Sequence, residues 1–384
     1  MNALLFERYL RELDLDFNTP DSLTNKIKLC SYLVCCGASV NLDSYRTRDK
    51  DLRTGNAGLQ LLVGSPHLRA LIPYYYMNGE NPLSVEGDYA AGKAALKYAG
   101  KEFFEVSILT EVDTGNENIS YEFDSLIAAV PGRPRGIRSC CYHSMGKACA
   151  FCALSTKKID LGPEDLVKAY GQIEDKHGTA PQVLLTGGNS RGKDRGLSKF
   201  IPYVRALRRS FPEARVAIEA SPPQDARLID NLIESGMHTF AANIEFFSAA
   251  DRTRLLPGKS EIPIADYERV FDRCIAANIE TFSVIIAGPE SREGTLEGVR
   301  YLTSIGVPAN LLCVRPFPGS RLENTPRVNP SWFLDLTGDA VMIMDRSNML
   351  AGLSRTAGCG SCGACSMEMN LFRLRNGIGR VHMP

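Results

Sequence analysis

Seven of the 12 cysteines in this chain lie in two short groups whose spacing suits metal binding. The first group begins at Cys140 and Cys141 and ends in Cys149-Ala150-Phe151-Cys152, which puts two thiols on one tight turn. A single metal centre can take both of these thiols as thiolate ligands, whether it is zinc or an iron–sulfur cluster. The group therefore predicts a metal site rather than core packing.

A third thiol upstream of the pair, Cys141 with Cys140 in reserve, makes iron–sulfur chemistry the better hypothesis. Three thiolates leave one iron of a [4Fe–4S] cluster without a protein ligand. An open coordination position separates catalytic metal sites from closed structural ones. The loop is therefore typical of an enzyme that binds a second molecule at its cluster.

The cysteine loop resembles the cluster loop of the radical S-adenosylmethionine (SAM) superfamily. The usual spacing there is CxxxCxΦC, and Phe151 stands at the aromatic position Φ. Cys141 and Cys149 are separated by seven residues instead of three, as if Ser144 to Lys147 or so had been inserted. This departure leaves the choice of first ligand between Cys141 and Cys140.

The second group places Cys359, Cys362 and Cys365 at CxxCxxC spacing in a glycine-rich loop. It resembles part of a ferredoxin-type run that lacks the fourth cysteine and the following proline. It predicts an auxiliary [4Fe–4S] cluster, for which Cys313 is a weak candidate as fourth ligand. In the superfamily such clusters bind substrate, carry electrons or surrender sulfur, and the sequence does not choose among these roles.

The composition limits the partners of the protein. Among 384 residues, 44 basic and 44 acidic side chains cancel, so no long-range field attracts nucleic acid or an anionic membrane. The charged N-terminus and the absence of an apolar run of 18 residues argue against a signal peptide and a membrane span. We therefore expect a cytoplasmic protein that acts on a small molecule or a peptide.

From residue 136 onward, strand and helix patterns alternate. Near-continuous apolar strands are typical of a parallel sheet whose outer face is covered by helices, and six such units predict a partial (β/α)6 TIM-like barrel. The functional face of such a barrel lies at the carboxyl ends of its strands. The expected strands are Ile137–Cys141, Gln182–Thr186, Arg215–Ala220, Thr239–Phe246, Thr281–Ala287 and Ala309–Val314. The expected helices are Pro163–Lys176, Leu197–Ser210, Pro223–Ser235, Pro263–Ala277 and Gly294–Ser304.

The chain is expected to have three parts. An N-terminal α+β extension of unassigned role covers 1–134, the barrel covers 135–323, and a C-terminal segment with the second cysteine group covers 324–384. Cys30, Cys35, Cys36 and Cys274 lie in apolar helical patterns and are best explained as buried core residues.

After the second expected strand, Gly187-Gly188-Asn189 resembles the GGE motif of the superfamily. That motif holds the SAM amino group through backbone carbonyls and an acidic side chain. Asn189 replaces the acid, and its amide oxygen can still accept a hydrogen bond from an ammonium. The plainer alternative is a glycine turn after a strand, because glycine permits conformations and close approaches that other residues do not.

Three further residues are similar to SAM contacts of the family. Glu245, at the end of the fourth expected strand, is similar to an acid that binds the SAM ribose. Arg252 and Lys259 follow it, as a basic residue that meets the SAM carboxylate does in the family. Glu219 ends the third strand and suits either substrate or SAM. Gly288, in Ile286-Ala287-Gly288-Pro289-Glu290, resembles a backbone contact to adenine. For each glutamate the alternative is an ion pair at the rim of the barrel.

The resemblance implies a radical SAM enzyme with a [4Fe–4S] cluster, SAM and a second iron–sulfur cluster. An external donor such as flavodoxin or ferredoxin would supply the electron that cleaves SAM, and the 5′-deoxyadenosyl radical would abstract hydrogen from the substrate. The reaction outcome, whether oxidoreductase, transferase or lyase, stays open. The alternative is a zinc-binding structural protein, in which Cys149, Cys152, Cys362 and Cys365 would form one closed site.

Overall fold

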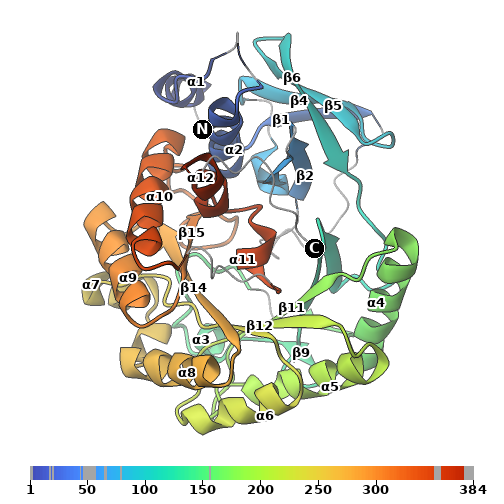
Figure 1. Ribbon diagram of the computed structural model, residues 1–384, viewed down its shortest axis with the longest axis vertical. Coiled ribbons are helices and arrows are strands. Elements are labelled where there is room, and N and C mark those ends of the chain that lie inside the picture. The colour runs from blue at the N-terminus through green and yellow to red at the C-terminus, as the bar shows by residue number, and fades with distance from the viewer. Residues whose placement is uncertain are drawn as a thin grey trace.

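The computed structural model describes residues 3–16, 19, 21–43, 45, 58–64, 67–77, 80–154, 157–349 and 356–375. Its largest sheet has seven strands in the order β15-β14-β13-β12-β11-β8-β7, and all neighbours except β7 and β8 run parallel. The six parallel strands curl around a common interior, as the partial-barrel prediction requires (Figure 1). The strands are β7 (Ile119–Glu122), β8 (Ser125–Ala129), β11 (Gln182–Thr186), β12 (Arg215–Glu219), β13 (Thr239–Ala241), β14 (Glu280–Ala287) and β15 (Ala309–Cys313).

Helices cover the outer side of this sheet (Figure 1). Each turns an apolar face inward, as α8 does by burying Tyr267, Val270, Phe271 and Cys274. The prediction that Cys274 belongs to the core is therefore confirmed. The covering helices are α4 (Pro163–His177), α5 (Ile201–Ser210), α6 (Asp230–Glu234), α8 (Ile264–Ala276) and α9 (Arg292–Ser304). Short 3-10 turns η2 (Leu197–Phe200) and η3 (Ala226–Ile229) precede α5 and α6.

The first strand of the barrel is not the one that the sequence predicted. Ile137–Cys141 was expected there, yet the structure gives only β9 (Ile137–Arg138), which pairs antiparallel with β10 (Lys157–Lys158) outside the barrel sheet. The position beside β11 belongs to β8, through the register Leu126↔Val183 to Ala129↔Thr186. β8 is buried whereas Ile137 is 55% exposed, so the apolar run at 126–130 forms the strand beside β11. The barrel sheet therefore begins inside the segment assigned to the N-terminal extension.

The N-terminal part forms a second sheet of six strands in the order β1-β4-β5-β6-β2-β3. Helix α2 packs on β3 and buries Cys30, Cys35 and Cys36, as expected for cysteines in an apolar helix. The elements are α1 (Ala3–Glu12), α2 (Leu23–Cys36), β1 (Ser39–Asp43), β2 (Gly58–Val63), β3 (Leu68–Pro73), η1 (Tyr74–Tyr76), β4 (Leu83–Asp88), β5 (Lys93–Tyr98) and β6 (Lys101–Leu109).

The C-terminal segment joins the two sheets. Helix α10 (Pro330–Asp345) packs against both α2 and α9, and Arg327 just before it lies 3.8 Å from the centre of the Tyr76 ring. Helix α11 (Cys359–Cys362) lies near the middle of the molecule, and α12 (Glu368–Arg375) packs on α10 and α2 (Figure 1). None of the helices in the described ranges has the length and apolar character that a membrane crossing needs.

Glu368 at the start of α12 is a buried acid that ties the C-terminal segment to β15. Its Oε1 accepts a hydrogen bond from the backbone N–H of Leu311, its Oε2 has no partner, and the residue is 1% exposed. Burial raises the pKa of Glu368 from 4.5 to about 7. Its charged form therefore destabilises the folded state at neutral pH.

We expect Glu368→Gln to remove a pH-dependent loss of stability. Between pH 4.5 and 7 the unfolded chain releases this proton before the folded chain does, so stability falls as pH rises through that window. The total loss is roughly 3 kcal/mol. Glutamine keeps an acceptor for Leu311, so thermal unfolding between pH 4 and 8 should depend less on pH in the variant. An unchanged pH profile would contradict this, and Glu297→Gln, at an exposed position of α9, is the control.

Candidate functional site

The cysteine loop is closed at its base by a two-stranded ribbon. Strands β9 and β10 pair on either side of it, and Ile159 N–H donates to the carbonyl of Gly136 at 2.8 Å. Cys140 follows β9, and Cys141 begins the short helix α3 (Cys141–Ser144). The backbone N–H of Cys152 donates to the Cys149 carbonyl at 3.1 Å, which forms the expected tight turn.

The loop is held against a second segment that follows β13. Ala150 N–H donates to the Leu255 carbonyl at 2.7 Å, and Gly258 N–H donates to the Lys147 carbonyl at 3.1 Å. A Cβ on Gly258 would lie 2.3 Å from the Tyr142 ring, so only glycine permits this close packing. Leu255 ends α7 (Ala249–Leu255), and Gly258 precedes η4 (Lys259–Glu261). The seven residues between Cys141 and Cys149 thus form the surface that binds this segment.

Cys149 lies in an environment with several charged neighbours. Burial raises the pKa of its thiol, and the charges that act on it include those of Glu245, Cys152 and Cys140. Burial also raises the pKa of the Cys141 thiol, on which the charge of Cys140 acts. Cys140 also packs directly on the next strand end, because a Cβ on Gly188 would lie 2.7 Å from the Cys140 Cβ.

The Gly187-Gly188-Asn189 turn lies beside this thiol, at the carboxyl end of β11. The backbone N–H of Cys141 donates to the Asn189 carbonyl at 2.8 Å. Lys199, which the sequence reasoning missed, donates from Nζ to the Gly188 carbonyl, and burial lowers its pKa to about 8. A buried cation therefore lies next to the cysteine loop, where it favours negative charge on the thiolates.

Glu245 is held in a strained backbone conformation at the carboxyl end of the sheet. Its φ is +64°, a left-handed value that glutamate rarely adopts, and it pairs with Ile285 in an isolated parallel bridge. Oε1 accepts from Lys259 Nζ at 2.9 Å, whereas Oε2 is buried without a partner. Burial alone would lower the pKa of Lys259, but the Glu245 carboxylate outweighs it and the net shift is upward. Strain beside a half-satisfied carboxylate is characteristic of a ligand site.

Glu219 is a second buried acid at the same edge of the sheet. Asn243 donates from Nδ2 to its Oε1, and the Asn243 Oδ1 accepts from Val284 N–H at 3.1 Å. Burial raises the pKa of Glu219, so the carboxyl is poised closer to its neutral form than an exposed glutamate. The alternative explanation was a simple ion pair at the rim of the barrel. This explanation suits Glu245, which pairs with Lys259, better than it suits Glu219.

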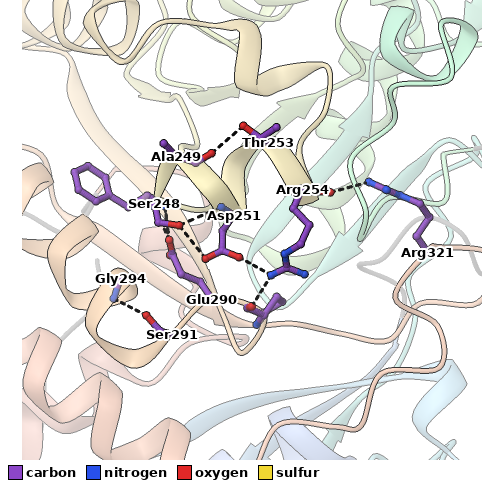
Figure 2. Close-up of polar contacts among 11 residues, drawn as sticks. Ser248, Ala249, Asp251, Thr253, Arg254, Glu290, Ser291, Gly294 and Arg321 are labelled. Carbon is purple, nitrogen blue, oxygen red and sulfur yellow. Dashed lines mark hydrogen bonds and ion pairs between the residues drawn. The ribbon is translucent and has the colours of Figure 1, made fainter.

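Gly288 lies apart from these residues. Its φ is +119°, and a Cβ there would meet the side chains of Val328 and Val314 at 3.0 and 3.1 Å. The nearby Glu290 turns to the segment after Glu245 and accepts from the backbone N–H of Ser248 at 2.6 Å (Figure 2). Glu290 therefore holds the loop that carries Glu245, and nothing in its contacts favours a ligand.

A cavity of about 330 Å³ connects the two cysteine groups. Phe151 and Cys152 of the first cysteine group border it, and so do all three cysteines of the second group. Its polar lining comes from the ends and middles of the parallel strands. The lining residues are Tyr75, Phe151, Cys152, Ala153, Glu219, Asn243, Glu245, Val284, Ile286, Asn310, Leu312, Cys313, Val314, Arg315, Phe317, Cys359, Cys362, Ala364, Cys365 and Ser366.

The C-terminal cysteines enter the barrel from the amino ends of its strands. Gly358 N–H donates at 2.7 Å to the side chain of Gln182, the first residue of β11. A Cβ on Gly358 would lie 3.2 Å from Ala217, inside the barrel. Burial raises the pKa of all three thiols, so a bound cation is needed to keep them as thiolates. The loop from Cys140 to Cys152, through Phe151 and Cys152, and this second group therefore border one cavity.

The N-terminal sheet holds the second cysteine group in place. Leu71 N–H on β3 donates to the Ala364 carbonyl at 3.2 Å, and Arg69 donates to the Cys362 carbonyl at 3.3 Å. Arg69 also forms a two-pronged ion pair with Asp124, at 3.0 and 3.1 Å. The position of the C-terminal cysteines thus depends on residues of the N-terminal part.

Arg315 and Cys313 lie next to Cys365. Arg315 hydrogen-bonds the Cys365 thiol and favours its charged form. The Cys313 sulfur lies 3.7 Å from the Val34 carbonyl of α2 and contacts the Cys35 thiol. Arg315 and Asn310 were missed by the sequence reasoning, although a polar residue within an apolar strand is the signal that would have found Asn310. Tyr75 also lines the cavity.

The donor set fits iron–sulfur clusters better than one closed metal site. Within the described ranges, no three His, Cys, Asp or Glu side chains converge on a point as the ligands of one ion must. A four-iron cluster binds each thiolate through a separate iron, so its ligands surround a volume instead. The four thiols of the alternative zinc site, Cys149, Cys152, Cys362 and Cys365, form no such group within the described ranges.

Comparison with known proteins finds distant similarity. No family model matches the chain. Bacteriochlorophyllide c C-7(1)-hydroxylase of Chlorobaculum limnaeum is 22% identical over 222 residues, which are 51% of this chain and 55% of that protein. The match thus spans about half the length of this curated relative.

The comparison with solved structures finds further distant matches. Methylornithine synthase (PylB) is 15% identical with a TM-score of 0.45, over 62% of this chain and 70% of that chain. The radical S-adenosylmethionine methyltransferase TsrM of Kitasatospora setae, with cobalamin and a [4Fe–4S] cluster bound, is 10% identical with a TM-score of 0.42, over 67% and 62%.

The contact between Gly188 and Cys140 leads to a prediction. In Gly188→Ala the new Cβ would lie 2.5 Å from the Ser139 carbonyl oxygen, so Cys140 must shift. We expect lower iron content after anaerobic reconstitution and a loss of roughly 1–3 kcal/mol in unfolding free energy. Gly338→Ala in α10 is the control, because nothing lies within 4 Å of its Cβ position. Normal iron binding by Gly188→Ala would show that this contact does not shape the site.

Proposed function

We propose that this protein is a radical SAM enzyme with a [4Fe–4S] cluster in the loop from Cys140 to Cys152. The observation that carries the proposal is the direct packing of Cys140 on Gly188, at the carboxyl edge of a six-stranded parallel sheet. Three thiols, a glycine turn and a strained buried glutamate meet at this edge. Such an arrangement suits an open metal centre beside a bound cofactor.

Cys140, Cys149 and Cys152 are proposed as the cluster ligands, and Cys141 is the alternative to Cys140. The nearness of Cys140 to Cys149 supports this choice, as does the use of the Cys141 backbone to bind Asn189. Lys199 offsets negative charge at the thiolates, which makes the added electron easier to accommodate. Phe151 packs near Phe246, at a centroid distance of 6.4 Å, and keeps water from the cluster side of the cavity.

The proposed SAM contacts follow from unused polar groups at the same edge. Glu245 offers the partnerless Oε2, Asn189 an amide, and the backbone of Gly187 and Gly188 allows a ligand to approach closely. Glu219 faces the cavity and suits either SAM or substrate, and Gly288 is retained only as a backbone contact. With an external electron donor such as flavodoxin or ferredoxin, the cluster and SAM would supply a 5′-deoxyadenosyl radical. The protein residues bind, orient and exclude water.

The second cysteine group is proposed to hold an auxiliary iron–sulfur cluster. Cys359 and Cys362 lie on one helical turn, and the charges of Cys359, Cys362 and Cys365 act on one another. Arg315 compensates negative charge at Cys365. The shared cavity supports a substrate-facing role for this cluster.

Anaerobic purification and incubation with SAM and dithionite test the main proposal. The protein should be brown, contain iron instead of zinc, and form 5′-deoxyadenosine. Cys140→Ala, Cys149→Ala and Cys152→Ala should each lose the cluster-loop iron and the product, because three thiolates are required. Cys141→Ala should keep both.

Cys274→Ala, in the core of α8, controls for the loss of any buried thiol and should remain active. Normal turnover by Cys149→Ala or Cys152→Ala would end the assignment. Loss of iron in Cys141→Ala, with retention in Cys140→Ala, would restore Cys141 as the first ligand.

The auxiliary cluster has a separate test. Replacing Cys359, Cys362 and Cys365 together by alanine should lower iron from about eight to about four per chain, since two four-iron clusters become one. SAM cleavage in the absence of substrate should persist, because the proposed ligands of the cluster loop are unchanged. Iron content equal to that of the wild-type protein would refute an auxiliary cluster.

A further inference from the structure

Asn310 is a buried amide whose hydrogen-bonding capacity is unused. It lies on β15, lines the cavity between the two cysteine groups, and is 1% exposed. Neither Oδ1 nor Nδ2 has a hydrogen-bond partner among the residues that the structure describes. Buried polar groups are almost always paired, because each unpaired group loses its bonds to water without replacement. An amide with both ends unpaired therefore needs a specific explanation.

The other amide in the cavity wall makes the contrast clear. Asn243 uses Nδ2 for Glu219 and Oδ1 for the Val284 N–H, so it serves the structure of the protein. Val284 is also the register partner of Asn310 on the other side of β14. Two asparagines thus flank one strand position, and only Asn243 has partners within the described residues.

The remaining lining limits the charge of any ligand. Each charged side chain of the cavity wall has a partner in the described part of the chain. Glu219 bonds Asn243, Glu245 bonds Lys259, and Arg315 bonds the Cys365 thiol. The walls near Asn310 are apolar, with Val284, Ile286 and Leu312 among them. A charged group placed there would lose its hydration without gaining a counter-ion.

We propose that Asn310 anchors the substrate, and that the substrate is uncharged, largely apolar and bears a carboxamide, a lactam or another adjacent N–H and C=O. Such a group satisfies both ends of the asparagine amide at once, donating to Oδ1 and accepting from Nδ2. That the bound molecule is a substrate rests on the proposed function. That Asn310 binds a ligand rests only on its amide and on the cavity.

The position of Asn310 relates the bound molecule to the strained glutamate. Asn310 is the second residue of β15 and the register partner of Val284 on β14, and Glu245 bridges to the next residue of that strand, Ile285. A molecule anchored at Asn310 is therefore held level with Glu245 in the sheet, beside apolar walls. The cavity has a volume of about 330 Å³, at the small end of the usual range for ligand pockets, roughly 300–1,000 Å³.

Three probes of nearly equal shape test the chemical class on the anaerobically purified full chain. Benzamide offers both a donor and an acceptor, acetophenone only an acceptor, and benzoate a charge. Ligand-observed NMR titration should show benzamide binding about five- to tenfold more tightly than acetophenone, with benzoate weakest. In Asn310→Leu, which has a similar volume, benzamide should lose this advantage.

Thermal unfolding separates this role from a structural one. Because the amide is unpaired, Asn310→Leu should unfold at the wild-type temperature or above, whereas Asn243→Leu should unfold lower. A large drop for Asn310→Leu, or unchanged benzamide preference in that variant, would mean that Asn310 binds only buried water or protein. Both results overturn the proposal.

The same samples distinguish the two hypotheses. If the wild-type protein binds benzamide with the expected preference but forms no 5′-deoxyadenosine from SAM, the ligand site stands and the proposed function falls. If it cleaves SAM yet binds benzamide no better than acetophenone, the enzyme assignment stands and the substrate class is wrong.

Discussion

The parallel barrel is not closed, so residues from outside the sheet must fill its interior. The rest of the structure depends on these residues. Six parallel strands run from β8 to β15, and β15 does not pair back onto β8. Side chains from the N-terminal part reach both ends of this sheet. Gln60 of β2 accepts from Phe123 N–H beside β8, and Tyr75 packs on Phe317 beyond β15, at a centroid distance of 5.0 Å. The C-terminal cysteine loop then occupies the space that a closed barrel would fill with side chains.

The polar residues of the cavity are unevenly paired. Asn243 uses both ends of its amide, for Glu219 and for the Val284 N–H. Among the described residues, Oε2 of Glu245 and both polar atoms of Asn310 have no partner. Unpaired polar atoms and the positive φ of Glu245 lower stability, so they persist only where the surrounding structure is rigid enough to hold them. Such atoms also occur away from the cavity, as Oε2 of Glu368 shows.

Sequence patterns predicted five of the barrel strands because apolar runs such as Phe282-Ser283-Val284-Ile285-Ile286 report burial directly. They misplaced the first strand because the short apolar run in β8 precedes a proline-rich turn that looks like a domain boundary. Local patterns also contain no information on long-range pairing, so the contact of Leu71 with Ala364 and the support that Arg69 gives to Cys362 could not be foreseen. The cysteine groups were visible as spacing. The packing of Cys140 on Gly188 became visible only in the structure.

The cavity that both cysteine groups border also limits the chemistry that can take place in it. A reactive species formed at the carboxyl edge can be used selectively only if the substrate is already fixed in direction and water is absent. Apolar walls of Val284, Ile286 and Leu312 provide the second condition, but they cannot fix direction, because apolar contacts are not directional. A directional anchor must therefore be a polar group whose bonds the protein has left unmade. Asn310, whose amide has no partner among the described residues, meets this requirement.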